Sequence, residues 1–276
     1  MASLSSNAAA NGIGLDIKGV AVIEAHIYPH VEKSVSDQEW NQRVARAACY
    51  RLLAHYRMTD LIYTHISARV PDAKDTFLIN PYGLMFHEIT ASSLVKVDHD
   101  GNVLDDQTGM GVNRAGFIIH SCIHRARPQL NCVIHTHTAA GIGVAAQKRG
   151  LLMLSQHAMR FYEGVAYHDY EGVALDEEEQ PRLVRDLGQH NAMILRNHGL
   201  LTAGYTIREA FDAMYYLERA CQAQIAAQAG GAEVLECSPD VAAKVARQFK
   251  TPDGSELYDW PALLRLLDGI DSSFRR

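Results

Sequence analysis

Three histidines stand at spacings that suit a metal site. His135 and His137 form a His-x-His pair at the end of an apolar run, which favours a β-strand. Because side chains alternate between the two faces of a strand, the two imidazoles share one face. His198 follows a second apolar run, 192–196, and could supply a third nitrogen. Three imidazoles leave coordination positions open for water or substrate, which is typical of a catalytic metal centre.

The composition argues against several classes of protein. The 276 residues are 47% hydrophobic and 21% charged, as in ordinary globular proteins, and the net charge of −6 offers no basic face for nucleic acid. No apolar run reaches the length of about 18 residues that a membrane span needs, and the N-terminal residues do not resemble a secretory signal. The five cysteines are scattered, without a C-x-x-C pair. We therefore expect a cytoplasmic protein with reduced thiols, no nucleic-acid partner and no membrane partner.

Helical and strand-like patterns alternate along the chain, which predicts the α/β class. Ser36 with Glu39, and Thr206 with Glu209, have the spacing of helix N-caps. Helices are expected at 35–56, 113–127, 138–149, 176–190, 206–228, 239–249 and 260–267. Strands are expected at 61–70, 76–80, 93–98, 102–104, 151–154, 164–167 and 192–196, and in the run that carries His135.

Further spacings extend the pattern beyond the three histidines. His198 stands sixty-one residues after His137, and His120 stands fifteen residues before His135 in a helix that ends at Arg127-Pro128. A strand and turn at 77–83 are followed by Glu88-Ile-Thr90 and a strand at 94–98. Over about 39–230 the chain resembles the class II aldolase/adducin superfamily, in which a His-x-His strand end and a later His-Gly build the metal site.

The resemblance implies the architecture, the metal and the assembly. It implies a single three-layer α/β/α domain with a mainly antiparallel central sheet at 16–235, after a disordered tail at 1–15. A helical extension at 236–276 would pack on its own or a neighbouring subunit. The metal ligands would be His135, His137 and His198, holding a divalent ion for which Zn²⁺ is the first choice and Mn²⁺ or Fe²⁺ the alternatives. The protein would be a homotetramer acting on a small-molecule substrate.

The chain also departs from the sugar-phosphate aldolases of this family. Gly116 stands where they carry an acid/base glutamate, with Arg114 and Ala115 in place of paired serines. Their Gly-Asn-x-Ser phosphate loop is replaced by Thr64-His-Ile-Ser67, and the tyrosine that follows His157 in the family is Ala158 here. The segments 63–67 and 78–83 are similar to the adducin-like branch. These differences argue against a sugar phosphate as substrate.

Another group must then handle the proton. The residues we select as catalytic candidates are His65, His157 and Tyr162; His120, Tyr82 and Tyr170 were also considered. The simpler interpretation of His120 is a histidine in the core or behind the metal ligands, with His124 at the surface beside it, and Glu88 is expected to be structural. Asn197 is expected to orient the ring of His198.

Three functions fit these residues. The leading one is a metal-dependent lyase, aldolase- or decarboxylase-like, that cleaves a carbon–carbon bond in a small non-phosphorylated carbonyl compound such as a 2-oxo or 2-hydroxy acid. The first alternative is a non-haem iron oxygenase acting on an aromatic 2-oxo acid. The second is a non-catalytic, adducin-like binding module.

Overall fold

The computed structural model describes residues 13–15, 21–23, 26–71, 73, 75–172, 177–250 and 256–276. An eight-stranded sheet in the order β6-β5-β4-β3-β7-β10-β9-β8 organises them. Neighbouring strands are antiparallel except β8 and β9, which are parallel. The prediction of an α/β fold with a mainly antiparallel sheet is confirmed. The strands are β3 (His65–Arg69), β4 (Thr76–Ile79), β5 (Val95–Asp98), β6 (Val103–Asp105), β7 (Cys132–Thr136), β8 (Val165–His168), β9 (Ala192–Leu195) and β10 (Gly199–Gly204).

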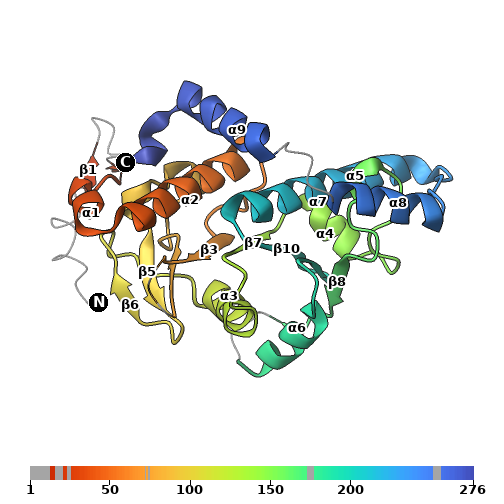
Figure 1. Cartoon of the computed structure of the whole chain (residues 1–276), viewed down its shortest axis with the longest axis horizontal. Coiled ribbons are helices and arrows are strands. Elements are labelled where there is room, and N and C mark those ends of the chain that lie inside the picture. The colour runs from red at the N-terminus through yellow and green to blue at the C-terminus, as the bar shows by residue number, and fades with distance from the viewer. Residues whose placement is uncertain are drawn as a thin grey trace.

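Helices cover both faces of this sheet, giving three layers (Figure 1). The upper face in that view carries α2 (Asp37–His55), α4 (Ala139–Ala145), α5 (Gln156–Met159), α7 (Ile207–Gln228), α8 (Pro239–Lys250) and α9 (Glu256–Ile270). The lower face carries α3 (Arg114–Ala126) and α6 (Gln180–Leu187). Outside these layers, α1 (Pro29–Ser34) precedes α2, and β1 (Ile13–Leu15) pairs with β2 (Ala21–Ile23). Short 3-10 helices complete the described elements: η2 (Phe86–Glu88), η3 (Ala91–Ser93), η4 (Glu177–Glu179), η5 (Ala229–Gly231) and η6 (Ser272–Arg275).

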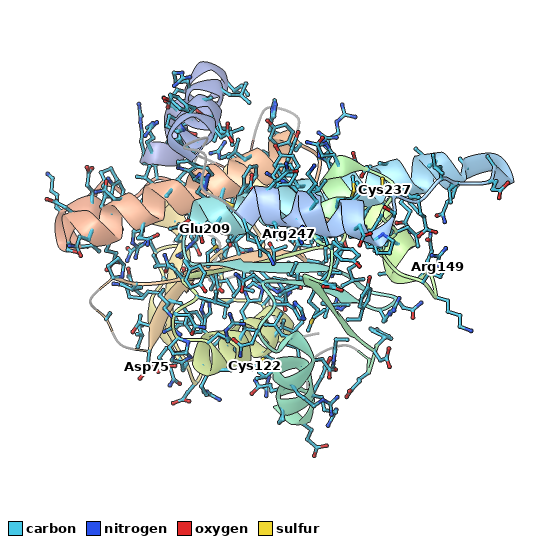
Figure 2. All side chains as sticks on the ribbon, turned by 45° about the vertical axis from the view of Figure 1, so that its right-hand side comes forward. Asp75, Cys122, Arg149, Glu209, Cys237 and Arg247 are labelled. Atoms are coloured by element: carbon cyan, nitrogen blue, oxygen red, sulfur yellow. The ribbon has the colours of Figure 1, made fainter. Side chains whose placement is uncertain are left out.

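The alternation of side chains along β7 divides the core in two. Ile134 faces α2 and α7 in the larger apolar cluster, whereas Val133 faces α3 and α6 in a smaller one. Figure 2 shows side chains on both sides of the sheet, with Cys122 of α3 on one side and Glu209 of α7 on the other. His135 has the parity of Val133, so its ring lies on the α3 side.

The expected helix caps are present. The Ser36 side chain accepts the Glu39 N–H at the start of α2, and Thr206 accepts the Glu209 N–H at the start of α7. Each cap satisfies a backbone donor that would otherwise have no partner in the first turn. Thr138 caps α4 in the same way and fixes the direction of the chain directly after His137.

Several predicted elements differ from the structure. Residues 151–154 form no strand, and the strand expected at 61–70 begins only at His65. Strand β10 was not predicted, because its glycine-bounded, fully buried sequence shows no alternation. The disordered tail expected at 1–15 lies outside the described residues up to residue 12, but Ile13–Leu15 form β1.

The C-terminal extension packs on its own chain. Leu267 of α9 and Phe274 of η6 are buried in the larger apolar cluster, and Arg51 of α2 pairs with Asp271 at 3.1 Å. Among the described helices, none is both long enough and apolar enough to cross a membrane. All five cysteines are free thiols, four of them buried.

Candidate metal centre

The three histidines selected from the sequence meet at one end of the sheet. His135 lies on β7, His137 directly follows that strand, and His198 stands in the turn between β9 and β10. The Nε2 atom of His137 is 2.8 Å from Nε2 of His135 and 2.9 Å from Nε2 of His198. Strand β10 pairs with β7, which brings the third histidine to the first two.

The outer nitrogens of two of these rings are held by acceptors. Nδ1 of His135 donates to the carbonyl oxygen of Leu200 at 2.9 Å, and Nδ1 of His137 donates to a carboxylate oxygen of Asp60 at 3.0 Å. With the protons on Nδ1, the Nε2 atoms of both rings present lone pairs to each other. Lone pairs at this distance repel unless a cation lies between them. The donor set therefore fits a divalent metal, and an acceptor behind each ring is the usual support of metal-binding histidines.

Burial keeps the His135 and His198 imidazoles in the neutral form that binds metals. Burial lowers the pKa of His135 well below its ordinary value, and nearby histidines add to this effect. Burial, followed by the neighbouring His137 and His168, lowers the pKa of His198 to about 4. Neutral imidazoles near pH 7 require no deprotonation before they bind a metal ion.

A tight turn places the third histidine. Asn197 adopts a left-handed backbone conformation with φ 55°, and Gly199 follows His198. A Cβ atom on Gly199 would lie closer than 3.0 Å to the carbonyl oxygen of Thr136 on β7. Within the described residues the Asn197 side chain makes no hydrogen bond to His198, and its backbone N–H donates to the Ala145 carbonyl at 3.3 Å.

The three histidines, His135, His137 and His198, are called the triad below, and one side of it is open. The His135 ring is 1% exposed, whereas the Asp60 side chain is 45% exposed. Tyr170, an exposed residue, has its ring centroid 6.0 Å from that of His198. Leu61 and Tyr63, in the segment between Asp60 and β3, are also exposed. A small molecule could approach the metal-binding nitrogens from this side.

His65 lies next to the triad on the same face of the sheet. It is the register partner of His135 across β3 and β7, and the two ring centroids are 5.3 Å apart. The side chain is buried, and the backbone of Tyr63 lies within hydrogen-bonding reach of its ring. Burial and then His120 lower the pKa of His65 well below its usual value, so the ring is neutral.

The glycine at the position of the missing glutamate is explained by this histidine. A Cβ atom on Gly116 would lie 2.5 Å from Nδ1 and 2.6 Å from Nε2 of His65. Real Cβ atoms essentially never make such contacts, so a side chain at residue 116 would require the His65 ring to move. The imidazole thus occupies space next to the helix position from which the aldolase glutamate would project.

The other candidates lie in different surroundings. His157 of α5 packs against Tyr216 of α7, with centroids 5.0 Å apart, on the face of the sheet opposite His135. Tyr162 lies in the turn after α5, and no contact within the described chain joins either residue to the triad.

Glu88 accepts the Met85 N–H at 2.7 Å in η2, the expected structural role. His120 is buried, with its ring centroid 4.5 Å from that of His65; the expectation that His124 lies at the surface is wrong, since that side chain is also buried.

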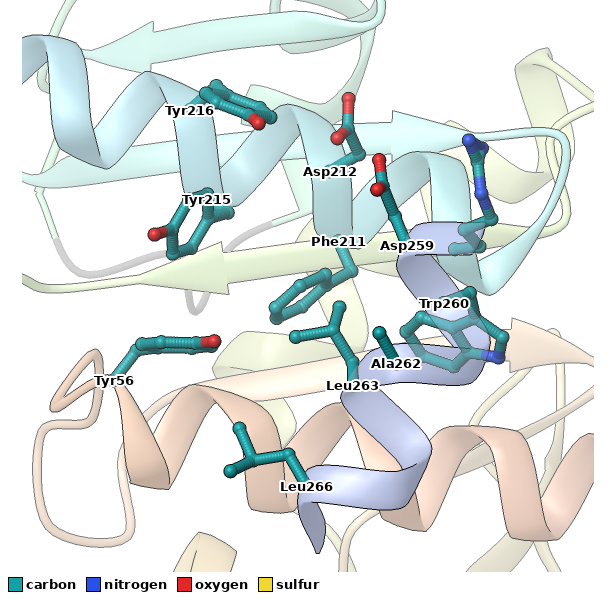
Figure 3. A pocket seen from close by; sticks show the side chains of 11 residues that line it. Tyr56, Phe211, Asp212, Tyr215, Tyr216, Asp259, Trp260, Ala262, Leu263 and Leu266 are labelled. Carbon is teal, nitrogen blue, oxygen red and sulfur yellow. The ribbon is translucent and has the colours of Figure 1, made fainter. Parts of the chain in front are cut away.

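A separate cavity lies between α7 and α9, on the other side of the sheet (Figure 3). Its volume is about 370 Å³ and it contains no member of the triad. Asp212 and Asp259 face it beside aromatic rings that include Phe211 and Trp260 (Figure 3). Asp212 already pairs with Arg160 at 3.2 Å, and this cavity adds nothing to the metal site.

Two features of the site were not found from the sequence. Asp60 was missed because it lies seventy-seven residues before His137 in an irregular segment, and no spacing rule connects them. The contact of Gly116 with His65 was missed because it depends on how α3 crosses β3. The signal for this contact in the sequence was a glycine at a helical position where the aldolase pattern has a glutamate.

This fold, with three histidines converging at one end of a mainly antiparallel sheet, matches solved structures of the class II aldolase superfamily. A family model described as "Class II Aldolase and Adducin N-terminal domain" matches residues 44–225. The chain belongs to this family.

Known relatives include both enzymes and adducins. A solved structure of an aldolase II superfamily protein from Pseudomonas syringae is 53% identical, with a TM-score of 0.86, covering 90% of this chain and 100% of that one. L-fuculose 1-phosphate aldolase from Glaciozyma antarctica is 27% identical, with a TM-score of 0.77, covering 92% and 97% of the two chains. Alpha-adducin of Rattus norvegicus is 42% identical over 83% of this chain, which spans only 33% of the adducin.

Proposed function

We propose that this protein is a divalent-metal-dependent carbon–carbon lyase acting on a small, non-phosphorylated 2-oxo or 2-hydroxy acid. The observation that carries the proposal is the convergence of three Nε2 atoms at 2.8 and 2.9 Å while the outer nitrogens of two rings are held by acceptors. Membership of the class II aldolase and adducin family supports it. We propose Zn²⁺ first, with Mn²⁺ and Fe²⁺ as alternatives.

The metal held by His135, His137 and His198 would polarise the substrate carbonyl and stabilise negative charge that develops on its oxygen. Asp60 holds His137 by its Nδ1 proton, and the Leu200 carbonyl holds His135 in the same way. Proton transfer falls to His65, whose ring lies beside His135 in the space next to Gly116. Of the tyrosines considered, Tyr170 lies nearest to the triad, against His198.

The preference for a substrate without phosphate rests on the segment 64–67. All four residues are buried, and the Ser67 hydroxyl is already bonded to His120 and His124 at 2.7 Å each. Such a segment offers no exposed donors to a phosphate group. The relative named L-fuculose 1-phosphate aldolase therefore supports the fold and the metal chemistry more than its own substrate class.

Metal analysis combined with a substrate panel tests the proposal. Protein purified without added metal should carry close to one zinc or manganese ion per chain, and His135→Ala should lose it. His87→Ala, which changes an exposed histidine in η2, is the control and should retain the metal. Retro-aldol or decarboxylation products should form from a panel of 2-oxo and 2-hydroxy acids, and addition of a chelator should stop their formation.

Two other results would redirect the proposal. Iron with oxygen uptake would support the oxygenase alternative, to which the relatives reported above give no support. Metal content near zero in the parent protein would support a binding module of adducin type, the second candidate, which the 42% identity to alpha-adducin favours. We also propose a homotetramer, for which the solution mass should be four times the 30.5 kDa of one chain.

A further inference from the structure

A fully polar contact lies between β3 and α3, where a helix packed on a sheet normally buries apolar side chains. The Ser67 hydroxyl oxygen is 2.7 Å from Nδ1 of His120 and 2.7 Å from Nε2 of His124. All three side chains are buried, and we call them the histidine–serine chain. The two histidines are four residues apart on α3, so both point at the same strand.

The single hydroxyl hydrogen of Ser67 limits how this chain can be protonated. Both short contacts can be hydrogen bonds only if Ser67 donates to one ring and accepts from the other. If Ser67 donates to His124, then His120 donates from Nδ1, and His124 carries its proton on Nδ1. If Ser67 donates to His120, then His124 donates from Nε2, and His120 carries its proton on Nε2. The two neutral rings are therefore always the same tautomer.

The two ends of the histidine–serine chain are Nε2 of His120 and Nδ1 of His124. In one tautomeric state Nε2 of His120 carries a proton and Nδ1 of His124 a lone pair, and in the other state the reverse holds. Nε2 of His120 and Nδ1 of His124 are both buried; Nε2 of His120 has no hydrogen-bond partner among the described residues, and the backbone of Leu130 lies within hydrogen-bonding reach of the His124 ring. At one end, the His120 ring contacts His65 with centroids 4.5 Å apart. His124 is also one of the residues that line a cavity of about 530 Å³, together with His99 and Asp75. His99 pairs with Asp75, an exposed carboxylate, at 3.3 Å.

We propose that the histidine–serine chain conducts protons between this cavity and the surroundings of His65. A proton that arrives at Nδ1 of His124 displaces the Nε2 proton of that ring to the Ser67 oxygen. Ser67 passes its own hydroxyl proton to Nδ1 of His120, which releases its Nε2 proton toward His65. One proton enters and one leaves, and the two rings change from the Nε2–H to the Nδ1–H tautomer together.

The charges around the chain favour transfer between neutral tautomers. Burial, followed by the guanidinium groups of Arg69 and Arg46, lowers the pKa of His124 to about 3. Burial, followed by His124, also lowers the pKa of His120 well below its usual value. A long-lived imidazolium is therefore disfavoured at either position, and Arg69 also donates to the backbone carbonyl of His124.

The use of this path in catalysis depends on the lyase activity proposed above, where a proton must reach or leave His65. The path itself does not depend on that activity. It would deliver protons from the α3 side of the molecule while substrate occupies the open side of the triad.

NMR of the unmodified protein, labelled with ¹⁵N at histidine, tests the proposal without any assay of activity. We expect His120 and His124 to be neutral at pH 7 and to show the same tautomer, or the same ratio of tautomers in exchange. Different dominant tautomers in the two rings, or a positively charged ring at pH 7, would overturn the proposal.

Variants of Ser67 test conduction. In Ser67→Ala the ring N–H protons of His120 should exchange with D₂O at least tenfold more slowly than in the parent protein, and Ser67→Thr should restore much of the rate because it retains the hydroxyl. Ser121→Ala is the matched control, since Ser121 is buried on the same helix and, within the described residues, its hydroxyl donates to the Ile118 carbonyl and to no histidine. Circular dichroism verifies folding. Unchanged exchange in a folded Ser67→Ala protein would refute conduction, even if the lyase activity were established.

Discussion

Asp60 offers a sharp test of the metal centre, because it lies outside the metal-binding set and acts on it through one hydrogen bond. Its carboxylate accepts the Nδ1 proton of His137 at 3.0 Å. This bond fixes the tautomer that leaves the Nε2 lone pair facing the other two rings, and it makes that nitrogen a stronger donor to a metal ion. Asp60→Ala removes both effects and leaves all three histidines in place.

The expected size of the effect follows from the exposure of the pair. Loss of such a partner lowers metal affinity by about 10- to 100-fold, which is about 1.4–2.7 kcal/mol. The Asp60 side chain is 45% exposed, so water can replace part of the lost acceptor. We therefore expect a loss of about tenfold for Asp60→Ala. Asp60→Asn should lose less, because its amide oxygen still accepts the proton.

Competition with a chromogenic chelator measures the affinity of each protein for Zn²⁺. Asp268→Asn serves as the control, because it removes a surface carboxylate that pairs with Arg275 and should leave zinc affinity unchanged. Zinc affinity in Asp60→Ala within twofold of the parent protein would refute the role given to this residue. Equal losses in Asp60→Ala and Asp268→Asn would show a general effect of surface charge instead.

Three further predictions concern stability. Gly116→Ala should lower the free energy of unfolding by about 1–3 kcal/mol in urea titrations, because its Cβ would overlap His65. The control is Gly269→Ala in α9, where a Cβ meets nothing within 4 Å, and it should be neutral or slightly stabilising. Equal effects of the two substitutions would contradict the contact between residue 116 and His65. Zinc at a hundred times its dissociation constant should stabilise the protein by about 2.7 kcal/mol, so a chelator should lower the melting temperature by several degrees, and no shift would argue against a metal bound by the folded state. The pKa of His124 is lowered to about 3 in the folded protein, against about 6.5 for an unfolded histidine. Between these two pH values the unfolded chain binds a proton at His124 that the folded chain does not bind. The free energy of unfolding should therefore fall as the pH falls through this window. In metal-free protein His124→Gln should reduce that slope by up to about 1.4 kcal/mol per pH unit, and an unchanged slope would show that His124 does not titrate this way.

The sequence was sufficient to predict the convergence of the triad but not its supports. The period of two along a strand places His135 and His137 on one face, and the apolar runs around them indicate buried strands. The third histidine reaches them through β10, whose Gly-Leu-Leu-Thr-Ala-Gly sequence has neither a strand alternation nor a helical period. The apolar run 192–196 indicated His198 as the third nitrogen and the family resemblance supported that choice, but neither predicts the strand that brings His198 to the other two.

The surroundings of the triad depend on contacts that no local rule supplies. His65 was selected for its strand position, but its proximity to Gly116 follows from the packing of α3 on β3. Tyr162 was selected over Tyr170, although the structure places Tyr170 against His198. The contact of His65 with Gly116 and the contact of Tyr170 with His198 both join segments that are distant in the sequence. The spacing of residues along the chain does not predict such contacts.

Substitutions of the neighbouring residues Gly199 and His198 would affect different parts of the structure. Any side chain at this position would collide with the Thr136 carbonyl and separate β10 from β7, which would disturb the middle of the sheet. A substitution of His198, in the turn beside it, would remove one metal-binding nitrogen and leave the strand pairing intact. The candidate metal site could therefore be lost in a single substitution while the architecture is kept, whereas the glycine would have to stay.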